Sequence, residues 1–205
     1  MRLLTTFTLL TICLTAIGQT FLTEKKKTLT YYPGTYIDTE SRYTDSTGKS
    51  VIIQNSLPKG GVRYTDATGQ NFGYVIFWTR VINETATPME FTINFPGSFP
   101  SPYSYLKLVL PPDTMTLDKE SLYNYGVTDL ESFLDTNFNK PTTFQKTINA
   151  KEECLFYVAV LSSKLGGAVR ARLALEEHDL FYSVRGIAPE LDSESIPCGQ
   201  IVFKN

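Results

Sequence analysis

Apolar and polar side chains alternate along several short stretches, and this period of two constrains the fold more than any other feature. Successive residues of a β-strand point to opposite faces of a sheet, so alternation is typical of strands with one buried face. The residues between 74 and 82 and between 154 and 161 are apolar on both faces, which predicts central strands covered on both sides. The alternating stretches are 89–95, 106–110, 169–175 and 180–184.

Turn-forming residues separate these stretches at short intervals, at 83–88, 162–167 and 176–179. Many short strands with such spacing are typical of a mostly antiparallel sandwich or barrel. We therefore expect an all-β protein, a two-sheet, immunoglobulin-like antiparallel β-sandwich. The single Trp78 is expected in the core, although the Cys-Trp-Cys order of antibody domains is absent.

An eight-residue pattern occurs twice, at 42–49 and at 63–70, and each copy contains Asp-x-Thr-Gly. The side chains of Asp45 and Asp66 can accept hydrogen bonds from their own turns, and the glycine supplies a positive φ. We expect two similar hairpins. A calcium site is the alternative, but calcium takes six or more oxygen ligands and the distal glutamate of a calcium loop is missing.

The alternation stops between residues 113 and 139. Asp118 can cap a short helix, and residues 128–131 form a capping box that opens a second helix. We expect a two-helix insertion over about residues 118–137 that covers an edge or an open end of the sandwich.

The first eighteen residues have the layout of a secretory signal peptide, with a short positive start, an apolar middle and a small-x-small end at Gly18. We expect cleavage between Gly18 and Gln19, a polar lead-in over 19–30 and one domain over 31–205. The protein is then secreted or periplasmic, within the cell envelope. No later apolar stretch reaches the ~20 residues of a transmembrane helix.

Cleavage removes Cys13 and leaves Cys154 and Cys198. Two thiols in an oxidising compartment usually pair, so the sequence predicts a disulfide between them. The alternative is two buried free thiols, because cysteine packs well as a small apolar residue.

Charge and motifs argue against several classes of function. The net charge is −2, with 19 basic and 21 acidic residues, so the chain lacks the clustered positive charge of a nucleic-acid-binding protein. The one histidine, His178, lies in an acidic turn and does not make a metal site or a catalytic triad by itself. We expect no catalytic residues, no metal and no cofactor, and the protein is not expected to be an enzyme.

The loop over residues 95–105 is the best candidate for ligand binding because three prolines stiffen it and rigid aromatic side chains give large contact areas. Its alternative role is to fold its aromatics back onto the core. Tyr123 and Tyr125 form a second aromatic pair with the same two possible roles, ligand binding or packing on the core. The candidate ligand-binding residues are Phe99, Tyr103, Tyr105, Tyr123 and Tyr125.

Together these features predict a secreted or periplasmic, non-catalytic β-sandwich protein that binds a protein or glycan partner through end loops. One alternative is an extracellular hydrolase that uses carboxylates, because 21 acidic residues offer many possible pairs. The other is a structural or assembly subunit of a cell-envelope complex, which would carry a large flat apolar patch.

Overall fold

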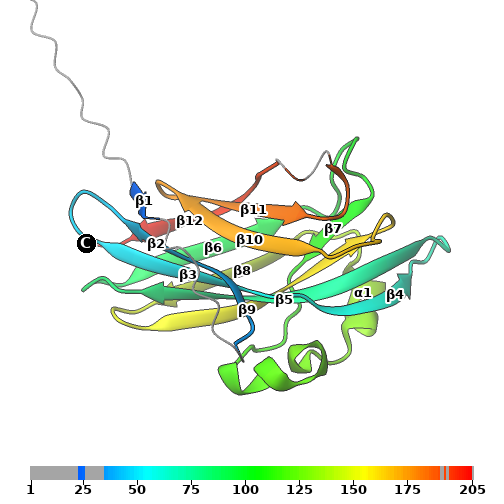
Figure 1. Cartoon of the computed structure of the whole chain (residues 1–205), viewed down its shortest axis with the longest axis horizontal. Coiled ribbons are helices and arrows are strands. Elements are labelled where there is room, and N and C mark those ends of the chain that lie inside the picture. Colours follow the sequence, from blue (N-terminus) through cyan, green and yellow to red (C-terminus); the bar gives the residue numbers. More distant parts are fainter. Residues whose placement is uncertain (1–22, 26–34, 190–191, 193, 205) are drawn as a thin grey trace, which may run out of the picture.

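The computed structural model describes residues 23–25, 35–189, 192 and 194–204. The predicted signal peptide, residues 1–18, lies outside this part of the chain, as does most of the lead-in. The described residues form a mostly β structure with two antiparallel sheets, one α-helix and two short 3₁₀ helices (Figure 1).

The two sheets contain seven and five strands. The strands of the seven-stranded sheet are, in order, β1 (Thr23–Lys25), β2 (Ile37–Thr44), β3 (Ser50–Ser56), β5 (Asn71–Asn83), β9 (Glu153–Ser162) and β7 (Leu106–Val109), with β4 (Lys59–Thr65) pairing with β5 beside β3. Those of the five-stranded sheet are β10 (Arg170–Glu176), β11 (Asp179–Arg185), β12 (Ile196–Phe203), β6 (Met89–Phe95) and β8 (Thr142–Ile148).

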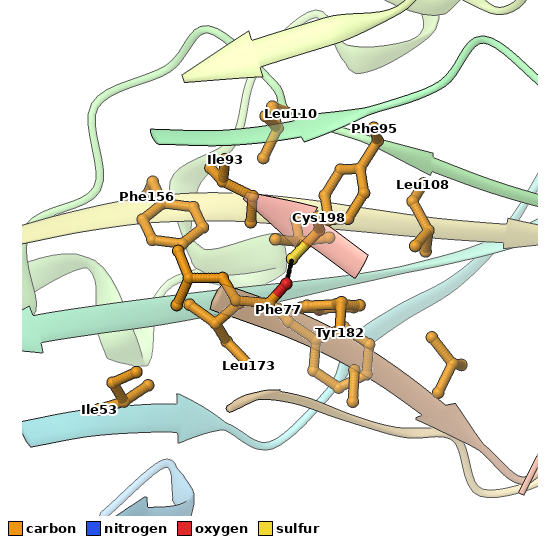
Figure 2. Close-up of a cluster of buried hydrophobic side chains, with 14 of the residues drawn as sticks. Ile53, Phe77, Ile93, Phe95, Leu108, Leu110, Phe156, Leu173, Tyr182 and Cys198 are labelled. Carbon is orange, nitrogen blue, oxygen red and sulfur yellow. Dashed lines mark hydrogen bonds between the residues drawn. The ribbon is translucent and has the colours of Figure 1, made fainter. Parts of the chain in front are cut away.

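One hydrophobic core lies between the two sheets and takes side chains from both. Phe77 and Phe156 come from the seven-stranded sheet, and Ile93, Leu173 and Tyr182 come from the five-stranded one (Figure 2). Each is at most 3% exposed. The alternation predicted for 89–95 and 180–184 is confirmed by β6 and β11, in which every second position is buried and every buried residue is apolar.

A second apolar cluster covers the other face of the seven-stranded sheet. Trp78 and Tyr157 project from β5 and β9 into this cluster, and both are fully buried. Residues 111–138, which we call the cover, pack against this face (Figure 1). The prediction that the strands around 74–82 and 154–161 are covered on both sides is therefore confirmed.

The repeated Asp-x-Thr-Gly sequence forms two matching hairpins, as predicted. Asp45 joins β2 to β3 and Asp66 joins β4 to β5. The Asp45 carboxylate accepts hydrogen bonds from the backbone N–H groups of Thr47 and Lys49, at 2.9 and 2.8 Å. Asp66 accepts the equivalent pair, both at 2.9 Å. These carboxylates are occupied in stabilising their own turns.

The expected insertion is found at about the predicted residues, but only part of it is α-helical, and it covers a face of the seven-stranded sheet and not an edge or an open end. Its first part consists of two 3₁₀ helices, η1 (Leu117–Ser121) and η2 (Tyr123–Gly126), and its second part is α1 (Leu130–Asn137). The capping box does not form, because Asp129 adopts a left-handed conformation with no side-chain cap. The Thr128 hydroxyl instead donates to Asp113 at 3.3 Å.

The predicted disulfide is not present: Cys154 and Cys198 are both free and buried. The Cys198 thiol, on β12, donates to the Leu180 carbonyl of β11 at 3.3 Å (Figure 2). Burial raises the pKa of the Cys154 thiol, on β9, to about 12, and the positive charge of Lys146, on β8, partly opposes this shift. The two cysteines come from different sheets, and both pack as free thiols in the core between them, which is the alternative that the sequence left open.

Candidate interaction surface

The cover contains a tight turn whose backbone is left-handed at two successive residues. Asn124 and Tyr125 have φ values of 47° and 56°. Non-glycine residues rarely adopt this conformation, and it persists only where the surrounding structure fixes it. The turn is therefore held in place by its contacts.

Tyr125 provides the deepest of these contacts, since it is fully buried against the seven-stranded sheet. Its hydroxyl donates to the Leu57 carbonyl at 2.6 Å, and its own carbonyl accepts from the Tyr157 hydroxyl at 2.7 Å. Burial raises the pKa of Tyr157 to about 12, so this donor keeps its proton at neutral pH. Leu57 lies between β3 and β4, and the turn is therefore bonded to the point where two strands meet along β5.

Lys59 provides a second set of contacts to the same segment. Its ammonium group donates to the carbonyls of Glu120 and Leu122, at 2.5 and 2.7 Å. The same nitrogen lies 4.2 Å from the ring centre of Tyr36 and 4.4 Å from that of Tyr125. Burial lowers the pKa of Lys59, and the charge of Glu120 partly opposes this shift. One cation thus ties η1 and η2 to the sheet.

This anchored turn presents apolar side chains to solvent. Leu117, Leu122 and Tyr123 are 41%, 49% and 76% exposed. Among the described residues only Val202 is a further large hydrophobic side chain of comparable exposure. We call these three residues, which lie at the start of η1, between η1 and η2, and at the start of η2, the apolar platform. An apolar group on a rigid support loses little conformational entropy on binding, as in protein-binding hot spots.

The cover, which contains the apolar platform, is negatively charged. Between residues 111 and 138 the chain has six acidic residues and one basic residue, Lys119. None of the six acidic residues is buried. They are Asp113, Asp118, Glu120, Asp129, Glu131 and Asp135.

Two hollows lie at the ends of the cover, around Pro111 and Phe133. One, of about 370 Å³, is lined by residues of β8 and β9 together with Pro111 and Phe133. The other, of about 440 Å³, lies between Pro111 and the start of α1. Both are lined in part by residues of the cover, and neither is lined by Leu117, Leu122 or Tyr123.

The aromatic residues predicted to bind a ligand are divided between core and surface. Phe99 and Tyr105 are 9% and 6% exposed and belong to the core between the sheets, and Tyr103 is half-buried against it. The loop over 95–105 thus folds its aromatics inward. Tyr125 is buried in the second cluster, and only Tyr123 is strongly exposed.

The structure places Tyr123 with two leucines and a lysine that the sequence did not single out for binding. Leu117 and Leu122 lie in the segment where the alternation stops, and that break was the available signal. Lys59 had no signal of its own, because its role depends on a contact with residues about sixty positions away.

A charged groove of about 400 Å³ lies elsewhere, on the outer side of β10 and β11. Burial raises the pKa of Asp38 in this groove, and the neighbouring guanidinium of Arg170 partly offsets that effect. Glu176, Asp192 and Glu194 also line it. His178 is exposed at the β10–β11 turn, and its carbonyl accepts from the Ile201 amide. The described residues contain no cluster of three metal-binding side chains.

Comparison with known proteins gives no relative: no family model, no curated protein and no solved structure matches the chain. Among the residues described, no helix has the length and apolar character needed to cross a membrane.

Proposed function

We propose that this is an exported, non-catalytic protein that binds a protein partner through the apolar platform of Leu117, Leu122 and Tyr123. The observation that carries the proposal is that three exposed apolar side chains lie along the η1–η2 segment, which Tyr125 and Lys59 fix to the sheet. Export rests on the leader-like sequence of residues 1–18.

The chemistry of the platform favours a protein over a glycan. Sugar sites combine an aromatic face with polar groups that bind hydroxyls, whereas two leucines flank the tyrosine here. The acidic residues around the platform complement a basic rim on the partner. The expected partner surface therefore has an apolar centre and lysine or arginine residues around it.

The architecture that supports this surface is proposed to be a β-sandwich, because the two sheets share one core. The immunoglobulin-like strand order stays a prediction. The chain changes sheet at every connection from β5 to β10, whereas immunoglobulin domains keep several pairs of consecutive strands in one sheet.

Site-specific photo-crosslinking in the native cell tests the proposal. A photoreactive phenylalanine analogue at Tyr123 should capture one defined protein, and the same analogue at exposed Thr68 serves as the control position. The purified partner should then bind the full-length mature protein, and Leu122→Asp or Tyr123→Ala should weaken binding at least about 30-fold without lowering Tm. Added salt should weaken binding as well, because the rim is charged.

Two results would contradict this function. One is the same crosslinked product at Thr68 as at Tyr123. The other is a purified partner whose affinity is unchanged by Leu122→Asp. Glycan binding that is lost in Tyr123→Ala but kept in Leu117→Ser and Leu122→Ser would instead favour a sugar ligand.

A carboxylate hydrolase is the second candidate, favoured only by the charged groove, where Asp38 has a raised pKa. Acid catalysts often have such a shift. If the protein hydrolyses glycosides or esters there, Asp38→Asn should abolish turnover while the platform variants retain it.

A further inference from the structure

The strand β8 leaves one side of the five-stranded sheet without a partner. Its seven residues pair with β6 in an unbroken antiparallel register, from Thr142 opposite Phe95 to Ile148 opposite Met89. No strand in the described part of the chain pairs with the other side of β8. This side is a free strand edge.

The register identifies the backbone groups that face this free edge. The amide of Lys204 donates to the Pro88 carbonyl, so Pro88 faces β12 and the next residue, Met89, faces β8. Backbone direction alternates along a strand, so Lys146 and Phe144 face β6. The backbone N–H and C=O groups of Thr143, Gln145 and Thr147 therefore point outward. All three residues are exposed.

β8 has only one of the features with which proteins usually protect a strand edge, a lysine on its core-side face. Such features are bulges, prolines, inward-pointing charges and very short strands. By contrast, β4 contains a register shift at Gly60/Val62, and β7 has only four residues. β8 has an unbroken register and no proline, and its one charged side chain, Lys146, lies on the same face as Phe144 and Ile148.

We infer that β8 pairs with β8 of a second copy of this chain, antiparallel and centred on Gln145. Gln145 is the middle residue of Thr142–Ile148, so a two-fold axis there pairs the whole strand with itself. Each outward-facing residue then meets an outward-facing residue of the second copy. The two five-stranded sheets become one continuous sheet across the dimer.

The side chains fit this register. Thr143 lies opposite Thr147 of the second copy, and Lys146 lies opposite Phe144 of the second copy. Threonine pairs are favourable across strands, and an ammonium beside an aromatic ring is attractive. A two-fold axis at Lys146 would instead place two lysines opposite each other, which is unfavourable.

The surroundings of Phe144 leave space for that lysine. Phe144 is half-buried and stacks on Phe156 with 5.2 Å between ring centres. The hollow of about 370 Å³ beside it is lined by Phe144, Lys146 and Leu155. The lysine of a second copy can therefore reach the ring of Phe144 without displacing the core.

The oligomeric state of the full mature protein tests the inference. Sedimentation should show a monomer–dimer equilibrium, and Gln145→Pro should abolish the dimer. Proline removes the outward N–H at this position and leaves the β6–β8 bonds intact, because the Gln145 amide does not face β6. An unchanged thermal transition separates loss of pairing from loss of folding.

Charge exchange at the two-fold axis tests the register. Gln145→Lys and Gln145→Glu should each weaken the homodimer several-fold, because like charges then lie opposite each other. Mixing the two variants should restore the wild-type affinity as a heterodimer. Thr92→Lys is the matched control, since Thr92 is the β6 neighbour of Gln145 and lies away from the edge; it should dimerise like wild type.

Three results would overturn the inference. The first is a wild-type monomer at every soluble concentration. The second is a dimer that Gln145→Pro does not affect, since another surface would then form it. The third is a Gln145 amide already protected from hydrogen exchange in the dilute monomer, which means that another segment of the chain covers the edge.

Discussion

The two edges of the five-stranded sheet differ in how their backbone groups are satisfied. At the β10 edge, Asn55 of the other sheet bonds the backbone of Leu173 twice. Its amide oxygen accepts from the Leu173 N–H at 2.8 Å, and its amide nitrogen donates to the Leu173 carbonyl at 3.2 Å. At the β8 edge no described strand offers an equivalent partner.

Asn55 is suited to this role because its amide group makes two further hydrogen bonds, to threonine side chains. The nitrogen donates to Thr39 at 3.0 Å, and the oxygen accepts from Thr79 at 3.3 Å. The residue is 3% exposed. A buried amide with every hydrogen-bonding position filled is stable where a partly filled one is costly.

Contacts from β2 add to the closure of the β10 edge. The Arg172 guanidinium donates to the Ser41 hydroxyl at 3.2 Å, and Arg170 pairs with Asp38 at 3.3 Å. The comparison teaches that side chains of one sheet can take the place of a missing strand in the other. An edge without them, such as β8, keeps its capacity for pairing.

Among the variants that test the difference between the β10 and β8 edges, Asn55→Leu should lower the stability most. Leucine has a similar shape but no hydrogen-bonding group, so it leaves the N–H and C=O of Leu173 buried without partners, at about 1–3 kcal/mol each. We expect the free energy of unfolding to fall by about 3 kcal/mol in urea denaturation.

Gln145→Leu at the open edge is the matched control for Asn55→Leu. Gln145 is exposed, so its replacement should change the unfolding free energy of the monomer by less than about 0.5 kcal/mol. Equal losses in the two variants would show that the edges do not differ as described.

Ser41→Ala should have a smaller effect at the closed edge, about 1 kcal/mol, because it removes one hydrogen bond to Arg172. A double-mutant cycle with Arg172→Met isolates that bond. If the two changes add without coupling, the contact does not help to close the edge.

The layers of this fold could be predicted from the sequence because burial leaves a pattern along the chain. The continuous apolar stretches of β5 and β9 predicted strands covered on both faces, and the Asp45 and Asp66 turns predicted hairpins. Lys107 broke the pattern: it is 6% exposed because its ammonium bonds the carbonyl of Gly97 and the side chain of Asn139.

The candidate surface could be predicted only in part, because it depends on contacts between distant residues. Tyr123 was chosen from the sequence, but nothing in the sequence separates it from buried Tyr125. Their difference arises from the left-handed turn at Asn124 and Tyr125, which follows no periodic pattern. The disulfide prediction failed for a similar reason, since cysteine spacing does not report which strands lie next to each other.

The smallest expected effect at the β10 edge is the contribution of Asp38 to the pH dependence of stability. Burial raises its folded-state pKa above the ordinary value of 3.8, despite Arg170. At a pH between 3.8 and the raised pKa, the Asp38 carboxyl is deprotonated in the unfolded chain but still protonated in the folded protein. Unfolding therefore becomes easier as the pH rises through this window.

Asp38→Asn removes this contribution, so its unfolding free energy should fall less than that of the wild type as the pH rises from 3.8 through the raised pKa. The ion pair is partly exposed, so the difference should stay below about 1 kcal/mol. Urea denaturation at a series of pH values measures it. If the variant instead loses more stability than wild type over the window, the attraction of Arg170 outweighs the burial of Asp38.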